Sequence, residues 1–188
     1  MQKSLKQISA VGVLSAMSFV LFLFPKFPIL AAFPWLDLDL SDVPGLFASV
    51  MISPLAGLGV ALIKNLLHLA VTSTGMIGEL SNFLINGTFV FAVGLVYHLL
   101  GRTGKMRSLA LSLAVGSVIQ LTAAILVNYF LMIPMYSAFV NFSELGGAQK
   151  YILAGVIPFN IVKDVLVSAI TVVLFHALYR KIHGYLHK

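Results

Sequence analysis

The feature that most constrains the fold of this chain is a series of long segments with almost no charge. Residues 108–133 carry no charged side chain, and clear apolar runs also cover residues 7–24, 80–100 and 151–179. A helix needs about 20 apolar residues to cross the hydrocarbon core of a bilayer. The sequence therefore predicts an all-α integral membrane protein.

The composition supports the same fold class. Hydrophobic residues make up 60% and charged residues 10% of the 188 positions, whereas soluble domains contain roughly 45–50% and 25%. Residues 1–188 are expected to form one transmembrane domain, with no room for a soluble catalytic domain. No small-residue cleavage site follows the first apolar run, so we interpret it as a retained helix. The absence of cysteine excludes disulfides and cysteine-ligated zinc.

The stretch 43–72 decides the number of crossings. It carries Pro54, Gly57 and Gly59, and its length fits either one kinked span or a hairpin of two short ones. Lys and Arg gather in three places without acidic neighbours: Lys3 and Lys6; Arg102, Lys105 and Arg107; and Arg180, Lys181 and Lys188. If all three clusters are cytoplasmic, an even number of crossings must precede the second. This favours the hairpin, with its turn at 53–57.

The prediction is thus six transmembrane helices, of which the second is short, with the N- and C-termini cytoplasmic. The basic clusters are typical of membrane anchors on a lipid bilayer rather than of a stripe that binds phosphates. No nucleic acid is therefore expected among the partners.

Ionisable and amide side chains lie inside the predicted helices. A charged side chain at mid-membrane costs about 2.5–3.5 kcal/mol on insertion scales, so such residues usually have a function. The set comprises Lys64, His68, Glu79, Lys163 and Asp164, together with Asn65, Asn82, Asn86, Asn128 and Asn160. Helical spacing places members of the set on shared faces, and these faces lie in the outer half of four helices. The pattern predicts a pocket that opens outward rather than a pore.

A structural role is the alternative for single members of this set. Lys64 or Lys163 could pair with Glu79 or Asp164 to fix helix register, and His68 is equally consistent with packing. Two lysines and two carboxylates make the pocket close to neutral, and asparagine both donates and accepts hydrogen bonds. The pattern favours a neutral ligand with many hydrogen-bonding groups.

The first outer loop, residues 25–42, alternates aromatic residues with prolines and ends in aspartates. The aromatic residues are Phe27, Phe33 and Trp35, and the aspartates are Asp37, Asp39 and Asp42. We interpret the loop as a semi-rigid lid over a planar ligand, with an interfacial aromatic belt as the alternative. Asp42 is also expected to be the N-cap of the second helix.

The first helix carries a stripe of small residues, Ser9, Gly12 and Ala16. Such a stripe permits close packing inside the bundle or against another protein.

The chain lacks the P-loop, H-E-x-x-H and G-x-S-x-G patterns. It therefore cannot hydrolyse ATP by a P-loop, and it is not expected to be an enzyme.

Three segments carry a resemblance to a known family. They are DLSDVPGLFASVMISPLAGLGVALIKNLLHL at 39–69, GMIGELSNFLING at 75–87 and PFNIVKDVL at 158–166. In this order they resemble the substrate-binding S components of energy-coupling factor (ECF) vitamin transporters, most closely the riboflavin-specific ones. Size, six spans and basic ends agree, so the resemblance covers nearly the whole chain.

The resemblance implies a capture subunit in the prokaryotic plasma membrane. It would bind riboflavin from outside as transported ligand, need no cofactor, and associate with a membrane coupling subunit and two ATPase subunits. The family's ligand contacts would fall on Glu79, Asn128, Asn160, Lys163 and Asp164, with Lys64 and the lid residues Leu38, Asp39 and Leu40 extending the set. The family's A-x-x-x-A coupling motif would fall on Gly12 and Ala16, with glycine in place of the first alanine.

Other functions compete with this one. The chain could be an S component for another neutral heterocyclic vitamin, because the pocket alone does not specify a flavin. It could also be an autonomous proton-coupled transporter that uses Glu79, Asp164 or His68 as the proton site. An intramembrane enzyme is disfavoured by the missing motifs.

Overall fold

The computed structural model describes residues 2–24, 27–30, 32–33, 36–72, 75–101, 105–138, 140–144 and 146–187, with side chains for 5–179 of these. Among the residues singled out from the sequence, Trp35, Arg102 and Lys188 lie outside the described residues. The side chains of Lys3, Arg180 and Lys181 are likewise outside the description.

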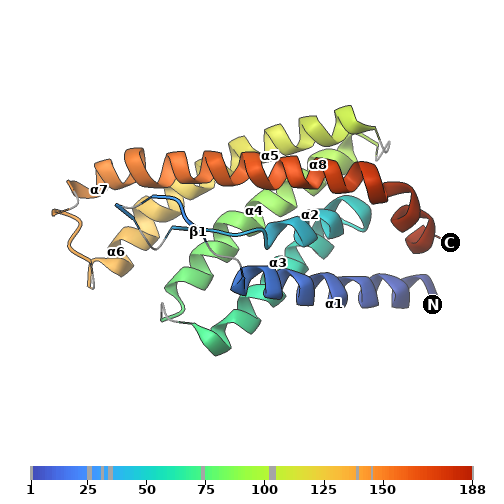
Figure 1. Cartoon of the computed structure of the whole chain (residues 1–188), viewed down its shortest axis with the longest axis horizontal. Coiled ribbons are helices and arrows are strands. Elements are labelled where there is room, and N and C mark those ends of the chain that lie inside the picture. Colours follow the sequence, from blue (N-terminus) through green and yellow to red (C-terminus); the bar gives the residue numbers. More distant parts are fainter. Residues whose placement is uncertain are drawn as a thin grey trace.

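The described chain is a bundle of helices that run along one long axis (Figure 1), so the all-α prediction is confirmed. In chain order the elements are α1 Gln2–Leu23, β1 Phe27–Pro28, β2 Asp37–Leu38, α2 Asp42–Met51, α3 Pro54–His68, α4 Ile77–Leu99, α5 Met106–Val127, α6 Ile133–Tyr136, α7 Gly147–Tyr151 and α8 Ile157–His187. A 3-10 turn, Leu69–Val71, extends α3, and π-helical turns, Asn128–Met132 and Ile152–Val156, join α5 to α6 and α7 to α8.

The bundle has six crossings although α2 is short. Within the described residues, five helical segments are long and apolar enough to span a membrane, and α2, with 10 residues, is not. At 1.5 Å per residue α2 covers about 15 Å, roughly half of the hydrocarbon core. The segment 36–40, which includes strand β2, runs in the same direction just before it (Figure 1). At about 3.3 Å per residue it adds roughly 16 Å, so the segment and α2 together complete the second crossing.

The connections separate into two groups at opposite ends of the bundle. Both termini, the α2–α3 turn and the α4–α5 connection lie at one end, which we call the terminal end (Figure 1). The β1–β2 loop and the connections after α3 and α6 lie at the other, which we call the lid end. This arrangement has the even number of crossings that the basic clusters predicted.

The turn between α2 and α3 falls at Ile52–Ser53, slightly before the predicted position. The Ser53 hydroxyl accepts a hydrogen bond from the Ala56 backbone N–H at 3.1 Å. Pro54 occupies the first turn of α3, where a missing N–H leaves no helical bond unmade. Pro54 therefore begins a helix rather than kinking one.

The expectation that Asp42 is the N-cap of α2 is wrong. Ser41 holds the cap position, and Asp42 is the first residue of the helix. The Asp42 carboxylate forms ion pairs with Lys64 and Lys163 instead. Two buried ammonium groups are stronger partners for a carboxylate than the N–H groups at a helix start.

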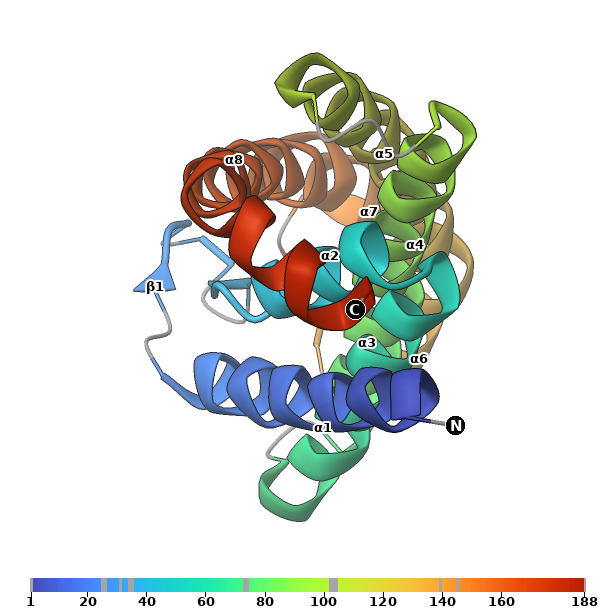
Figure 2. The ribbon, with the colours of Figure 1, turned by 90° about the vertical axis from the view of Figure 1, so that its right-hand side faces the viewer.

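All ten residues of α2 are buried, and the other helices surround it (Figure 2). Close approach to its neighbours depends on glycine. A Cβ at Gly57 of α3 would lie 2.5 Å from Ser49 Cβ and 2.7 Å from Val90 Cγ1. The apolar core around α2 includes Leu46 and Phe175, so the half of the bundle nearest the termini is closed by apolar packing.

One face of α1 packs on the bundle and the other faces outward. Ser15, Ser18 and Phe22 are buried, whereas Gly12 and Ala16 are exposed. A Cβ added at Gly12 would meet no atom within 4 Å. The small-residue stripe is therefore available to another protein and is not used inside the bundle.

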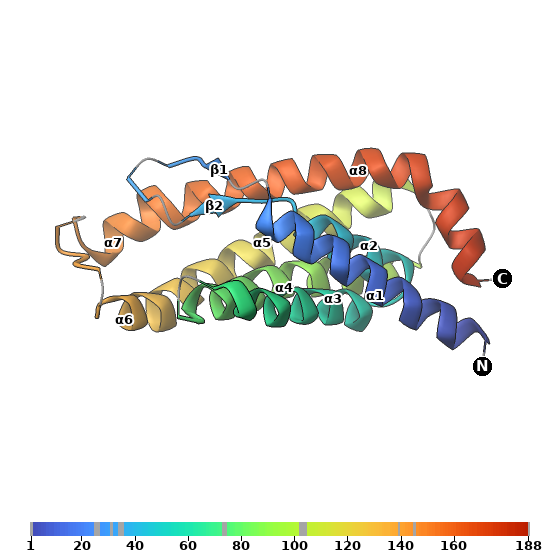
Figure 3. The same ribbon diagram turned by 60° about the horizontal axis from the view of Figure 1, so that its bottom comes forward.

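The described part of the predicted lid is a two-stranded hairpin beside the first half of α8 (Figure 3). Strands β1 and β2 pair antiparallel, with Phe27 opposite Leu38. Phe33 is buried against Tyr151, with ring centroids 5.2 Å apart, whereas Phe27 is exposed. Phe33 thus packs inward, as a lid residue would. Phe27 faces outward, as a residue of an interfacial aromatic belt would.

Candidate ligand-binding site

A polar cavity of about 270 Å³ lies in the half of the bundle nearest the lid end. Its walls come from the hairpin loop, the end of α1, α3, α4, the π turn after α5, and α6 to α8. Its polar wall residues are Asp37, Asp39, His68, Glu79, Ser81, Asn82, Asn86, Asn128, Asn160 and Lys163, and its aromatic ones are Phe22, Tyr136, Tyr151 and Phe159. A cavity with these walls suits a small molecule that has a flat ring and several hydrogen-bonding groups.

Two buried lysines hold residues 39–42, which we call the lid base. Lys64 Nζ lies 2.6 Å from Asp42 Oδ1, and Lys163 Nζ lies 3.1 Å from Asp42 Oδ2. Lys163 Nζ also lies 3.0 Å from Asp39 Oδ2. All four side chains are at most 4% exposed. Buried charges persist only when they are paired, and two lysines against two aspartates balance in formal charge.

These ion pairs differ from those considered from the sequence, in which Lys64 or Lys163 would meet Glu79 or Asp164. The lid base folds inward between α3 and α8 and brings Asp39 and Asp42 to the lysines. Helical periodicity could not predict this, because Asp39 precedes α2 and Asp42 is its first residue, so no helical spacing links them to the lysines of α3 and α8.

Ser41 ties the lid base to two neighbouring helices. Its backbone N–H donates to Asp39 Oδ1 at 2.8 Å, and its hydroxyl donates to the same carboxylate. Lys64 Nζ donates to the Ser41 hydroxyl at 2.6 Å, and the Ser18 hydroxyl of α1 donates to the Ser41 carbonyl. The lid base is therefore fixed to both α1 and α3.

A second buried pair joins α3 to α4 at the cavity wall. His68 Nδ1 lies 2.6 Å from Glu79 Oε1. The His68 ring also contacts Phe22 near the end of α1, with centroids 4.2 Å apart. His68 therefore has a packing contact and a polar contact together, and it positions the Glu79 carboxylate.

Two asparagines face the cavity beside the π turns. Asn128 donates to the Ala124 carbonyl at 2.8 Å and accepts from the Tyr151 hydroxyl at 3.3 Å. Asn160 donates to the Val156 carbonyl at 2.7 Å and accepts from the Gln120 amide at 2.7 Å. An amide has two N–H donors and two oxygen lone pairs, so each asparagine keeps capacity for a ligand.

The π turns and their role were missed from the sequence. Pro134 and Pro158 follow two residues after the π turns Asn128–Met132 and Ile152–Val156. Proline within a helix removes a backbone hydrogen bond, and a local change to π geometry is one way to accommodate it. The two prolines in otherwise apolar runs were the available signal.

Asn86 is a further cavity residue absent from the predicted ligand set. It is 5% exposed and lines the cavity. Its amide both donates and accepts hydrogen bonds, so it is a further candidate contact for a ligand in the cavity. The helical spacing from Glu79 to Asn82 and Asn86 was the signal for it.

Five residues of the predicted ligand set line the cavity: Asp39, Glu79, Asn128, Asn160 and Lys163. Lys64 lies behind the wall, against Asp42. Leu38 is buried in the hairpin opposite Phe27, and Leu40 packs on the apolar core around α2.

Asp164 does not line this cavity. It lines a separate groove between α5 and α8, beside Ser117 and Ser168. Consecutive residues of a helix differ by about 100° in direction, so Asp164 cannot point to the same place as Lys163. Its groove is otherwise mostly apolar.

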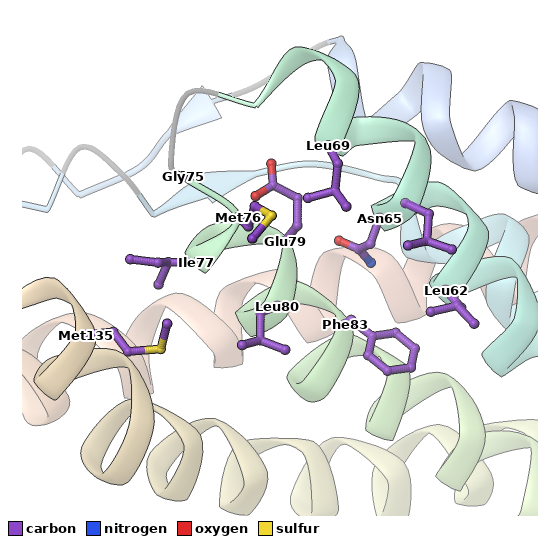
Figure 4. A pocket seen from close by; sticks show the side chains of 11 residues that line it. Leu62, Asn65, Leu69, Gly75, Met76, Ile77, Glu79, Leu80, Phe83 and Met135 are labelled. Atoms are coloured by element: carbon purple, nitrogen blue, oxygen red, sulfur yellow. The ribbon is translucent and has the colours of Figure 1, made fainter.

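A second cavity, of about 310 Å³, adjoins Glu79 on the outer side of α3 and α4 (Figure 4). Its walls are mainly apolar, and they include Leu62, Leu80 and Phe83. Leu62 is 42% exposed and would face acyl chains in a bilayer. The cavity with the polar walls is therefore the candidate ligand site.

Comparison with known proteins identifies the family. The family described as the substrate-specific component of ECF transporters matches residues 6–175. The chain belongs to this family. It is therefore a multi-pass membrane protein, and the S components are transporter subunits rather than a class of enzymes.

Two relatives and one solved structure extend the comparison. This S component is 34% identical over 184 residues to the riboflavin transporter RibU of Staphylococcus aureus, covering 97% of this chain and 93% of that protein. It is 29% identical over 175 residues to the riboflavin transporter FmnP of Bacillus subtilis, covering 90% of each. It is also similar to a solved S component of a bacterial ECF transporter, with a TM-score of 0.76, 32% identity, and 98% and 99% of the two chains covered.

Proposed function

We propose that this S component captures riboflavin and delivers it for ATP-driven uptake. The observation that carries the proposal is the similarity to the riboflavin transporter of Staphylococcus aureus along 97% of the chain. The cavity supports it, because aromatic walls suit the isoalloxazine ring while amides and carboxylates suit the ribityl hydroxyls.

In this proposal each cavity residue has a role. Glu79 and Asn128 bind ribityl hydroxyls, and Asn160 and Lys163 bind the polar edge of the isoalloxazine ring. Asp39 closes the site from the lid base. Lys64, Leu38 and Leu40 act indirectly, by holding the lid base and the hairpin in place. Asp164 is left out of the ligand set, because it lines the groove between α5 and α8.

The test is a titration of riboflavin fluorescence with the chain purified alone in detergent. Saturable quenching with one riboflavin per chain is expected, because the cavity lies within a single chain. Absence of quenching would overturn the proposal. Competition experiments with other neutral heterocyclic vitamins would then identify the S component's ligand.

We further propose that the exposed face of α1 with Gly12 and Ala16 docks on a membrane coupling subunit that works with two ATPase subunits. The protein would sit in the prokaryotic plasma membrane with its terminal end in the cytoplasm. Gly12→Phe should keep riboflavin binding but abolish uptake, because a Cβ at Gly12 touches nothing within the chain. Val118→Phe, on the exposed face of α5, is the control. Uptake in cells that lack the ATPases would contradict this part of the proposal.

A further inference from the structure

Asp42 lies outside the cavity wall, yet it controls the charge at that wall. Its two carboxylate oxygens hold different lysines, with Lys64 at 2.6 Å and Lys163 at 3.1 Å. Lys163 lines the cavity, whereas Asp42 and Lys64 do not. A change at Asp42 or Lys64 therefore alters the electrostatic potential in the cavity without removing a wall residue.

The lysine at the wall is already neutralised. A lysine ammonium is a common binding group for phosphate, but Lys163 is engaged by Asp39 and Asp42. The other ionisable groups of the wall are Asp37, Glu79, His68 in contact with Glu79, and Tyr136 and Tyr151. The wall thus presents no excess positive charge to a ligand.

We propose that Asp42 is a specificity-determining residue that keeps the cavity selective for an uncharged ligand over its phosphorylated form. The inference rests on the proposed function, in which the uncharged ligand is riboflavin and the phosphorylated form is riboflavin 5′-phosphate. Asp42 acts by balancing Lys64 and Lys163, and it does not touch the ligand itself.

The charge balance predicts opposite effects for two substitutions. Asp42→Asn leaves the two lysines and Asp39 with an excess of one positive charge, and Lys64→Met leaves an excess of one negative charge. A unit charge about 10 Å from a phosphate, at an effective dielectric constant near 20, changes affinity on the order of tenfold. The double variant Asp42→Asn/Lys64→Met is balanced again.

The experiment measures the dissociation constants for riboflavin and riboflavin 5′-phosphate by fluorescence quenching at low ionic strength. The ratio of the two constants should shift about tenfold toward the phosphate in Asp42→Asn and about tenfold away from it in Lys64→Met. The double variant should return to within about threefold of the wild-type ratio. Glu144→Gln changes the formal charge as Asp42→Asn does, but Glu144 is exposed in the loop before α7, so it should leave the ratio unchanged.

A purely structural role of the ion pairs would change both affinities together and leave their ratio constant, and that result would overturn the inference. If Asp42→Asn does not fold, Lys64→Met and the double variant decide by the same criterion. Failure of the wild type to bind riboflavin would instead overturn the proposed function.

Discussion

Lys163 and Asp164 are adjacent in the sequence, but the structure places them in different surroundings. Lys163 reaches the lid base and the polar cavity, whereas Asp164 lies in the groove between α5 and α8. Asn160, one helical turn before Asp164, lies on the cavity side with its amide fixed by Gln120. The candidate ligand site thus includes only part of the polar face of α8.

This division predicts different effects of neighbouring substitutions on riboflavin affinity. Asn160→Ala removes a proposed ligand contact. Such a loss costs about 1–3 kcal/mol, so affinity should fall on the order of 10- to 100-fold. Asp164→Asn should change affinity less than about threefold, since it alters no wall group. Equal losses in isothermal titrations of the two variants would contradict this assignment.

Sequence periodicity located the cavity side chains better than it located their partners. The i, i+3, i+4 spacing brought Asn160, Lys163 and Asp164 together, and two of the three share the cavity. The spacing could not reveal that Lys64 and Lys163 meet Asp42, because that contact joins the first residue of α2 to α3 and α8. Side-chain pairing between different elements is a tertiary property that no local pattern encodes.

All ten residues of α2 are buried among the other helices. Its neighbours approach so closely that a Cβ at Gly57 would overlap Ser49 and Val90. The short helix was expected from the count of crossings, but the extended segment that completes its crossing was not. The three aspartates of residues 37–42 indicated a loop outside the membrane. Asp39 and Asp42 are nevertheless buried, because they form ion pairs with Lys163 and Lys64.

Gly57→Ala should destabilise the protein, and Gly59→Ala should not. Overpacking a tight helix contact typically costs about 1–3 kcal/mol. A Cβ at Gly59, in the same helix, meets no atom within 4 Å, and alanine favours the helix by up to about 1 kcal/mol relative to glycine. Thermal unfolding in detergent should show a lower midpoint for Gly57→Ala alone. A similar decrease for both variants would mean that α2 is less tightly packed than described.

The molecule as a whole has two unlike ends. The terminal end has an apolar core, and the lid end contains the polar cavity under the hairpin. A binding site near one membrane surface and closed toward the other suits capture from one side. The basic residues near the termini lie at the terminal end, opposite the cavity, and basic residues favour the cytoplasmic side of a membrane.

The absence of native cysteine permits a direct test of orientation. Ser143→Cys lies in the exposed loop between α6 and α7 at the lid end, and Lys105→Cys lies at the terminal end. In intact cells a membrane-impermeant maleimide should label Ser143→Cys and spare Lys105→Cys. Both should react once the membrane is opened. The reverse labelling pattern would show that the lid end faces the cytoplasm.

We propose that this single chain binds riboflavin without its partners. The most direct measurement is the visible absorption spectrum of the chain purified alone in detergent from a flavin-replete host. We expect a flavin spectrum that stays with the protein through gel filtration, and a flavin that is released as unmodified riboflavin on denaturation. A colourless protein that also fails to quench added riboflavin would contradict it.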